Sequence, residues 1–192
     1  MIAILDYQAG NISSVQNAFN RLGVETKLTN DKDILKSADK IIIPGVGEAS
    51  TAMQDLIKND LVECIQNLTQ PVLGICLGMQ LLCDYSDEGE TDCIGIFKTK
   101  VKKFPSNEIV PHMGWNNFTE LKGPLFDSIR PQDDVYFVHS FFAELCAETI
   151  GITDYILPFS AALQKDNFYG TQFHPEKSDQ IGNQILTNFL AL

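Results

Sequence analysis

The sequence predicts an α/β fold with a mainly parallel sheet flanked by helices. Short apolar runs alternate with segments of 3.6-residue periodicity, which is typical of that class. Glycine or proline stands where segments end, as at Gly23 and Pro44. The chain has 192 residues, of which 44% are hydrophobic and 20% charged. That is enough for a single domain, residues 1–192, burying about 70% of the unfolded surface, and too apolar for a disordered chain.

The first expected strand covers residues 2–6. Asn11 is placed to cap the helix that follows, and Gly23 to end it. The apolar residues of that helix recur on one face, namely Val15, Ala18, Phe19 and Leu22.

A second strand over residues 24–28 and a short helix near 31–37 lead to the buried strand 40–43, which stops at Pro44. The loop 44–47 then lies at the carboxyl end of a sheet strand, where ligands collect in open α/β folds. We therefore expect this loop to border a binding crevice, although an ordinary turn has the same composition.

The second half of the chain is harder to assign. Strand-like segments lie near residues 94–104, 116–120, 135–142, 161–164 and 168–173, and residues 178–190 have the periodicity of a closing helix. In the first of these segments the lysines at 98, 100 and 102 share a face opposite Phe97 and Val101. We expect them to protect an exposed sheet edge, with partner docking as the alternative.

A cysteine lies between two glycines in Gly74-Ile-Cys-Leu-Gly-Met-Gln80, where an apolar run meets a helical one. This pattern predicts a nucleophile elbow, in which the glycines relieve crowding and Cys76 is exposed at a strand-to-helix turn. A helix N-terminus also favours the thiolate form. By itself the string equally fits an inert, buried cysteine.

A histidine and a carboxylate lie two residues apart in Phe173-His-Pro-Glu-Lys177. We expect Pro175 to keep His174 extended, so that His174 and Glu176 share a face and Glu176 holds one ring nitrogen. The other nitrogen is then free to exchange a proton with Cys76. A structural histidine with a surface ion pair is the alternative, but the two strings together favour a Cys-His-Glu triad.

The two strings together resemble the class I glutamine amidotransferases, whose glutaminase domains release ammonia through a cysteine thioester. Within that family the chain looks like the glutaminase subunits of imidazole glycerol phosphate synthases of histidine biosynthesis. That likeness is carried by residues 6–11 (Asp-Tyr-Gln-Ala-Gly-Asn), 44–47 (Pro-Gly-Val-Gly), 111–116 (Pro-His-Met-Gly-Trp-Asn) and 136–141 (Tyr-Phe-Val-His-Ser-Phe). It extends over residues 2–190 and implies a doubly wound sheet with a flavodoxin-like core.

The resemblance implies roles for further residues. The oxyanion hole would use the N–H of Leu77 and an N–H of the loop at Val46 and Gly47. Gly47, Gln80 and the backbone of Ser140 and Phe141 would hold the amino-acid head of L-glutamine, whereas Gln80 as a helix-surface residue is the alternative.

A partner is also implied, namely a (β/α)₈-barrel cyclase bound as a heterodimer. It would use the ammonia to convert a phosphoribulosyl-formimino aminoimidazole-carboxamide nucleotide into imidazole glycerol phosphate and aminoimidazole carboxamide ribotide. Asn11, Met113, Trp115 and Asn116 would lie at its interface. His112 and His139 are expected to be structural, since His174 already has an orienting carboxylate.

Composition excludes several other classes of function. A formal net charge of −11 argues against nucleic acid and anionic membranes as partners. The five cysteines, Cys64, Cys76, Cys83, Cys93 and Cys146, are odd in number and lack C-x-x-C spacing, so we expect neither a disulfide framework nor a metal site, and no cofactor. The absence of a long apolar run predicts no membrane span, and a reducing cytoplasm fits best.

Three other functions stay open. The chain could be a stand-alone cysteine hydrolase or peptidase, or a noncatalytic scaffold, although a scaffold would be expected to lose triad residues. A paralogous glutaminase that feeds a sugar amidotransferase of surface polysaccharide synthesis also fits the sequence.

Overall fold

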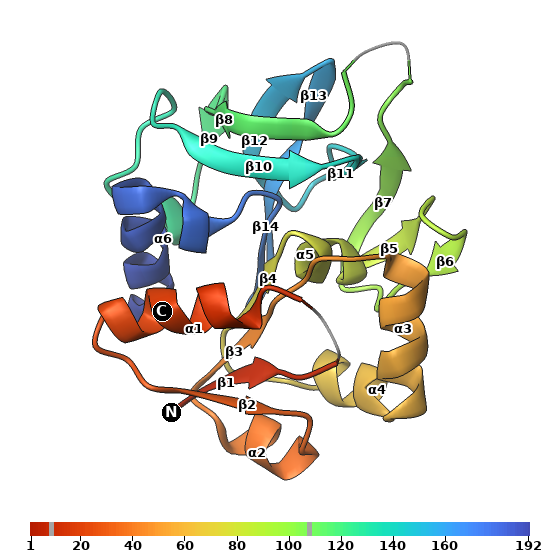
Figure 1. The fold of residues 1–192 in the computed structure, drawn as a ribbon, viewed down its shortest axis with the longest axis vertical. Coiled ribbons are helices and arrows are strands. Elements are labelled where there is room, and N and C mark those ends of the chain that lie inside the picture. Colours follow the sequence, from red (N-terminus) through yellow and green to blue (C-terminus); the bar gives the residue numbers. More distant parts are fainter. Residues whose placement is uncertain (8–9, 107–108) are drawn as a thin grey trace.

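Parallel strands form one half of the main sheet. The structure, a computed structural model, describes residues 1–7, 10–106 and 109–192 (Figure 1). The five strands of this half lie in the order β2 (Thr26–Thr29), β1 (Ile2–Leu5), β3 (Lys40–Ile43), β4 (Val72–Ile75) and β14 (Phe168–Thr171), each parallel to its neighbours. The strand that comes last in the chain therefore pairs with the strand that leads to Cys76.

The sheet continues beyond β14 with mostly antiparallel pairs. Its remaining strands are β13 (Leu157–Lys165), β11 (Phe141–Ala143), β7 (Phe97–Lys103), β5 (Cys83–Ser86) and β6 (Thr91–Asp92), with β12 (Thr149–Tyr155) paired to β13 and to β9 (Glu120–Leu121). Only β5 and β7 run parallel here. The expected mixed, mainly parallel and doubly wound sheet is confirmed.

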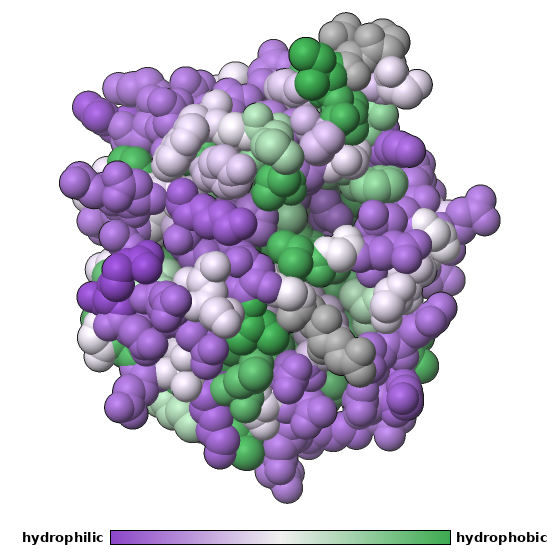
Figure 2. Space-filling model, in the orientation of Figure 1, coloured by the Kyte–Doolittle hydropathy of each residue, from purple (hydrophilic) through white to green (hydrophobic). Residues whose placement is uncertain are grey.

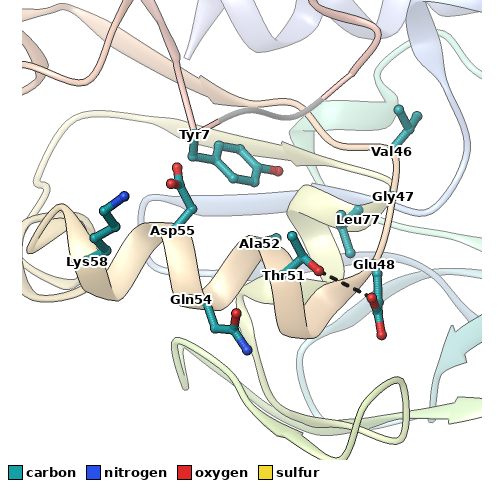
Figure 3. Close-up of a pocket in the computed structure, with 10 residues that line it drawn as sticks. All are labelled: Tyr7, Val46, Gly47, Glu48, Thr51, Ala52, Gln54, Asp55, Lys58 and Leu77. Atoms are coloured by element: carbon teal, nitrogen blue, oxygen red, sulfur yellow. Dashed lines mark hydrogen bonds between the residues drawn. The ribbon is translucent and has the colours of Figure 1, made fainter.

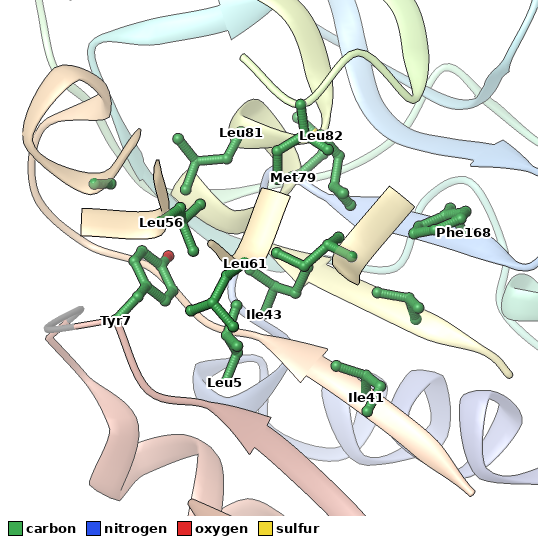
Figure 4. Packing of buried hydrophobic residues seen from close by; sticks show 14 of the residues in the cluster. Leu5, Tyr7, Ile41, Ile43, Leu56, Leu61, Met79, Leu81, Leu82 and Phe168 are labelled. Carbon is green, nitrogen blue, oxygen red and sulfur yellow. The ribbon is translucent and has the colours of Figure 1, made fainter. Parts of the chain in front are cut away.

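Helices cover both faces of the parallel half, because strand residues alternate between the two faces. Ile42 packs with α1 (Ile12–Arg21) and α6 (Asp179–Ala191), whereas Ile41 and Ile43 pack with α2 (Lys32–Ser37), α3 (Ala49–Lys58), α4 (Leu61–Gln66) and α5 (Leu77–Leu81). Figure 4 shows part of the cluster on the α2–α5 face, in which Leu56 and Leu61 lie above Leu5, Ile41 and Ile43. Two hydrophobic cores thus sandwich the sheet.

A two-stranded ribbon, β8 (His112–Asn116) paired with β10 (Val135–His139), lies outside the main sheet. Its inward residues Val135 and Phe137 belong to the core on the α1 and α6 face, with Phe159 of β13. One residue, Ser140, separates β10 from β11, so the chain passes directly from the ribbon into the main sheet. Two short 3₁₀ helices complete the fold, η1 (Pro124–Phe126) and η2 (Pro175–Lys177).

Most expected elements are present, with shifted boundaries. The strand expected over residues 116–120 is wrong, because β8 ends at Asn116 and β9 begins at Glu120. The expectation that the lysines of β7 protect a sheet edge is also wrong. Lys98 and Lys100 are exposed opposite buried Phe97 and Val101, but β7 lies between β11 and β5 and is therefore not an edge strand. Lys98 and Lys102 instead pair with Asp84 and Asp87 at 2.9 and 3.2 Å.

None of the helices in the described residues is both long enough and apolar enough to cross a membrane.

Candidate active site

Cys76 lies at a sharp turn between β4 and α5, as the elbow prediction requires. Its expected exposure is wrong: 7% of its surface is exposed, because it packs into the core on the α1 and α6 face. Its backbone has φ 53° and ψ −107°, a conformation that residues with a side chain rarely adopt and that occurs at functional sites. The turn is held on both sides: the Cys76 N–H donates to the Thr171 carbonyl of β14 at 2.7 Å, and the Cys76 carbonyl accepts from the N–H of Gln80 at 3.1 Å.

The two glycines allow α5 to lie directly against the sheet. A Cβ on Gly78 would lie 1.9 Å from the carbonyl oxygen of Ile43, and one on Gly74 would lie 2.7 Å from backbone atoms of Gly78. Both positions therefore exclude any side chain, which confirms the reason given for the glycines in the string.

His174 and Glu176 meet as predicted, but through a different local structure. The Nδ1 of His174 lies 2.8 Å from Oε1 of Glu176, and both side chains are buried. His174 is extended, with φ −101° and ψ 96°, yet residues 175–177 form the 3₁₀ helix η2 instead of continuing the strand. Glu176 thus reaches the imidazole from the first turn of η2, since proline favours the first turn of a helix as readily as an extended segment.

The backbone of His174 is anchored to the ribbon. Its N–H donates to the Tyr136 carbonyl of β10 at 2.9 Å, and the Ser178 hydroxyl donates to its carbonyl at 2.7 Å. The same hydroxyl accepts from the N–H of Tyr136 at 2.9 Å. The backbone of His174 is therefore fixed by β10 and by Ser178, the residue directly after η2.

Cys76 and Glu176 influence the charge of His174. Burial lowers the pKa of the imidazole, but the nearby Cys76 thiolate and the Glu176 carboxylate outweigh burial and raise it above the ordinary value of 6.5. Both groups act in the same direction, so the arrangement favours the protonated imidazole of His174. The Nε2 atom of His174 is buried without a hydrogen-bond partner among the described residues, which leaves it open for proton transfer.

Asn11 reaches the carboxylate of Glu176, a contact that the sequence did not indicate. It occupies the N-cap position of α1, but φ is 67° and its side chain makes no capping bond, so the capping prediction is wrong. Its Nδ2 instead donates to Oε1 of Glu176 at 2.6 Å. A left-handed N-cap turns the side chain away from the helix, whereas an extended one would direct it to the first-turn N–H groups.

A cavity of about 290 Å³ opens beside the sulfur of Cys76. Its lining contains all the residues expected to form the oxyanion hole and to hold substrate, namely Val46, Gly47, Leu77, Gln80, Ser140 and Phe141. Pro111, Val138 and His139 line it as well. Gly47 has φ 124°, which only glycine adopts freely.

Glu88 also lines this cavity, although no sequence pattern pointed to it. It lies between β5 and β6, where no catalytic pattern occurs, and its Oε2 accepts from the N–H of Ala49 at 2.9 Å. Burial raises the pKa of this carboxyl. A carboxylate is thus present at the wall of the cavity.

Gln80 is buried, with 4% of its surface exposed, so the helix-surface alternative is wrong. Its Nε2 donates to the Phe141 carbonyl at 3.0 Å and to Oε1 of Gln172 at 2.9 Å. The Nε2 of Gln172 in turn donates to the sulfur of Cys76 at 3.6 Å. The two amides tie the cavity wall to the cysteine.

A second cavity of about 360 Å³ also borders the 44–47 loop (Figure 3). Tyr7, Val46, Gly47 and Leu77 line it together with residues of α3. The buried hydroxyl of Tyr7 donates to the Pro44 carbonyl, which holds the start of that loop. Val46 and Gly47 therefore border both cavities.

Two of the expected interface residues are prominently exposed on the ribbon. Met113 and Trp115 have 63% and 56% of their surface exposed, whereas Asn116 and Asn11 are half-buried. The face in Figure 2 shows hydrophobic residues scattered in a broken band between hydrophilic ones. Of residues 6–11, Gln8 and Ala9 lie outside the described residues.

Comparison with known proteins places this geometry in a family. Residues 3–192 match the family Glutamine amidotransferase class-I. The chain is 56% identical over 194 residues to the imidazole glycerol phosphate synthase subunit HisH of Bacteroides thetaiotaomicron, covering 100% of this chain and 99% of the relative. It is 47% identical to the protein of the same name from Haemophilus influenzae, over 98% and 96% of the two chains.

Solved structures share the fold. A putative GMP synthase protein from Thermoplasma acidophilum superposes with a TM-score of 0.76 at 21% identity, covering 99% of this chain and 92% of the other. A structure of PurLQS from Thermotoga maritima gives a TM-score of 0.73 at 16% identity, covering 99% and 97%.

Proposed function

Because the chain belongs to the class I glutamine amidotransferase family, we propose that it hydrolyses L-glutamine to glutamate and ammonia as the glutaminase subunit of an imidazole glycerol phosphate synthase. The observation that carries this is Cys76 at a strained elbow beside His174, whose Nδ1 is held by Glu176 at 2.8 Å. Relatives that carry the synthase subunit name match essentially the whole chain. We treat residues 1–192 as one glutaminase domain.

Cys76 is the nucleophile in this proposal. Its thiolate adds to the side-chain amide carbon of glutamine, and His174 delivers the Nε2 proton to the departing nitrogen, so that ammonia leaves and a thioester remains. Neutral His174 then takes a proton from water as the water attacks the thioester. Collapse of that second intermediate expels the Cys76 thiolate and releases the product, whose new carboxylic acid loses its proton to solvent. His174 keeps the proton that it took from water, so the thiolate and imidazolium pair is restored.

The oxyanion of both intermediates is assigned to backbone N–H groups at Leu77 and at the Val46-Gly47 loop. These residues border the cavity on the side of Cys76. Leu77 is the first residue of α5, where N–H groups have no partner within the helix. Removing one such donor typically costs about a hundred- to a thousandfold in rate.

The amino-acid head of glutamine lies against Gly47, Gln80, Ser140 and Phe141 in this proposal. The Phe141 carbonyl already accepts from Gln80 and from His139, at 3.0 and 2.7 Å, and the Ser140 carbonyl accepts from Phe104 N–H at 3.0 Å. Backbone carbonyls are therefore poorly placed to take the substrate ammonium. We assign that role to Glu88, the acidic residue in the lining of the cavity.

The ammonia is consumed by a partner. We propose a (β/α)₈-barrel cyclase, docked as a heterodimer on Asn11, Met113, Trp115 and Asn116, which completes the synthase reaction. Support comes from the names of the relatives and from the exposure of two large apolar side chains on the ribbon. A cytoplasmic location agrees with five cysteines that are all free thiols.

Glutamate release by wild type and Cys76→Ala, each with and without the cyclase and its nucleotide substrate, tests the proposal. Stimulated, Cys76-dependent release is the expected result. Hydrolysis that the cyclase leaves unchanged would instead favour a paralogous glutaminase that feeds another synthase. Absence of hydrolysis in every arm would refute the enzymatic function.

A further inference from the structure

Two buried histidines outside the triad face each other across the ribbon. His112 of β8 and His139 of β10 are paired in register and have 3% and 6% of their surface exposed. The His112 ring is stacked between Phe137 and Tyr155, with ring centroids 4.7 and 4.0 Å away and interplanar angles of 22° and 14°. Its plane is therefore fixed by packing, and only hydrogen bonding at its edges remains to be decided.

The hydrogen bonds of the pair have only one consistent direction. The Nδ1 of His139 lies 2.7 Å from the Phe141 carbonyl, which can only accept, so Nδ1 carries the proton. Burial lowers the pKa of His139 to about 3 and that of His112 to about 4, so both rings are neutral at physiological pH. The Nε2 of His139 must then accept, and the Nδ1 of His112, 3.0 Å away, must donate to it.

The same reasoning gives the direction of the hydrogen bond between His112 and Asn116. Because Nδ1 of His112 carries its proton, Nε2 is an acceptor, and Nδ2 of Asn116 lies 3.3 Å from it. A directed series of bonds thus runs from Asn116 through both rings to Phe141.

Beyond Phe141 the series reaches the nucleophile. The Phe141 carbonyl accepts a second hydrogen from Gln80, whose other amide hydrogen goes to Gln172, and Gln172 donates to the sulfur of Cys76. His139, Phe141 and Gln80 also line the cavity beside Cys76. The hydrogen bonds of the histidine pair therefore help to position Phe141 and Gln80 in this wall of the cavity.

We infer that His112 and His139 are positioning residues for glutamine, locked as Nδ1–H tautomers so that they fix the Phe141 carbonyl and, through it, Gln80. This inference rests on the proposed function, since it names the residues that shape the same site. It assigns the pair an effect on substrate binding, while the proton transfers stay with His174.

Amide substitutions separate the hydrogen bond from the ring. The side-chain nitrogen of asparagine is as many bonds from Cβ as Nδ1, and that of glutamine as many as Nε2. His112→Asn therefore keeps a donor toward His139, whereas His112→Gln removes it. Measured as glutaminase activity at saturating cyclase and nucleotide, His112→Gln is expected to raise KM for glutamine about tenfold with kcat within about twofold. His112→Asn is expected to stay within about threefold of wild type in KM.

Equal KM values for the two variants, or a loss in kcat alone, would overturn the inference. A direct measurement needs no variant to fold: ¹⁵N NMR of the wild-type histidine rings distinguishes protonated from unprotonated nitrogens. Nδ1–H in both rings is expected, and Nε2–H in either ring would refute the assignment. Wild-type complex that fails to hydrolyse glutamine would refute the proposed function, while the NMR result would still decide the tautomers.

Discussion

Asn11→Ala removes one of the two donors to the Glu176 oxygen that holds His174. The lost bond is 2.6 Å long and ends on a buried carboxylate. Hydrogen bonds to charged groups contribute about 1.5 to 3 kcal/mol, which corresponds to about 10- to 150-fold in rate if all of it is lost in the transition state. Because Asn11 is only half-buried, water can replace part of the bond, and we expect a fall in kcat of about tenfold.

The assay is glutamate release at saturating cyclase, so that weaker docking of the partner does not contribute. Asn17→Ala is the matched control, since Asn17 is an exposed residue of the same helix. Asn11 acts through Glu176, so the fall in kcat should largely disappear when Asn11→Ala is added to Glu176→Gln and compared with Glu176→Gln alone. Activity of Asn11→Ala within twofold of wild type, or an equal loss in the Glu176→Gln background, would refute the reasoning.

The remaining predictions concern the elbow, the cavity and the histidine pair. Gly78→Ala places a Cβ 1.9 Å from the Ile43 carbonyl, and overpacking of this kind destabilises a fold by about 1 to 3 kcal/mol or more. Calorimetry should show Tm lowered by at least about 2 to 4 °C for each kcal/mol. An unchanged Tm would contradict the close packing of α5. Glu88→Gln should raise KM for glutamine at least tenfold and leave kcat within about threefold, because the proposed ammonium contact binds substrate and transition state alike; an unchanged KM would remove Glu88 from the site. Burial lowers the pKa of His112 to about 4 from 6.5, so between these two pH values the unfolded chain binds more protons than the folded one. The free energy of unfolding should therefore fall as the pH drops from 6.5 to 4. Urea titrations should show a smaller fall in this free energy for His112→Asn than for wild type, and an equal fall would argue against a neutral buried ring.

The elbow at Cys76 was predictable because its signal is local. A cysteine between glycines at a strand-to-helix junction needs no distant partner to be recognised, and Gly74 and Gly78 indeed contact backbone atoms. The histidine and carboxylate were also adjacent in sequence. The error there was one of local geometry, since Pro175 is compatible with both an extended segment and the first turn of η2.

The support around the triad depends on contacts that sequence spacing does not reveal. Asn11 and Glu176 are 165 positions apart, and a capping residue is the natural interpretation of an asparagine before a helix. Glu88 lies between the short strands β5 and β6, which have little hydrophobic patterning. The order of strands was equally hidden, so the lysines of β7 were assigned to an edge that the neighbouring β5 covers.

Placing β14 beside β4 has a consequence for how the protein is made. Those two strands carry His174 and Cys76 at their carboxyl ends, yet β14 is the last strand synthesised. Until it inserts, β4 lacks one neighbour and the cysteine lacks both its backbone acceptor at Thr171 and its imidazole. Long-range pairing of this kind forms late in folding. A nascent chain therefore carries Cys76 without His174 beside it, and the two side chains meet only when the sheet is complete.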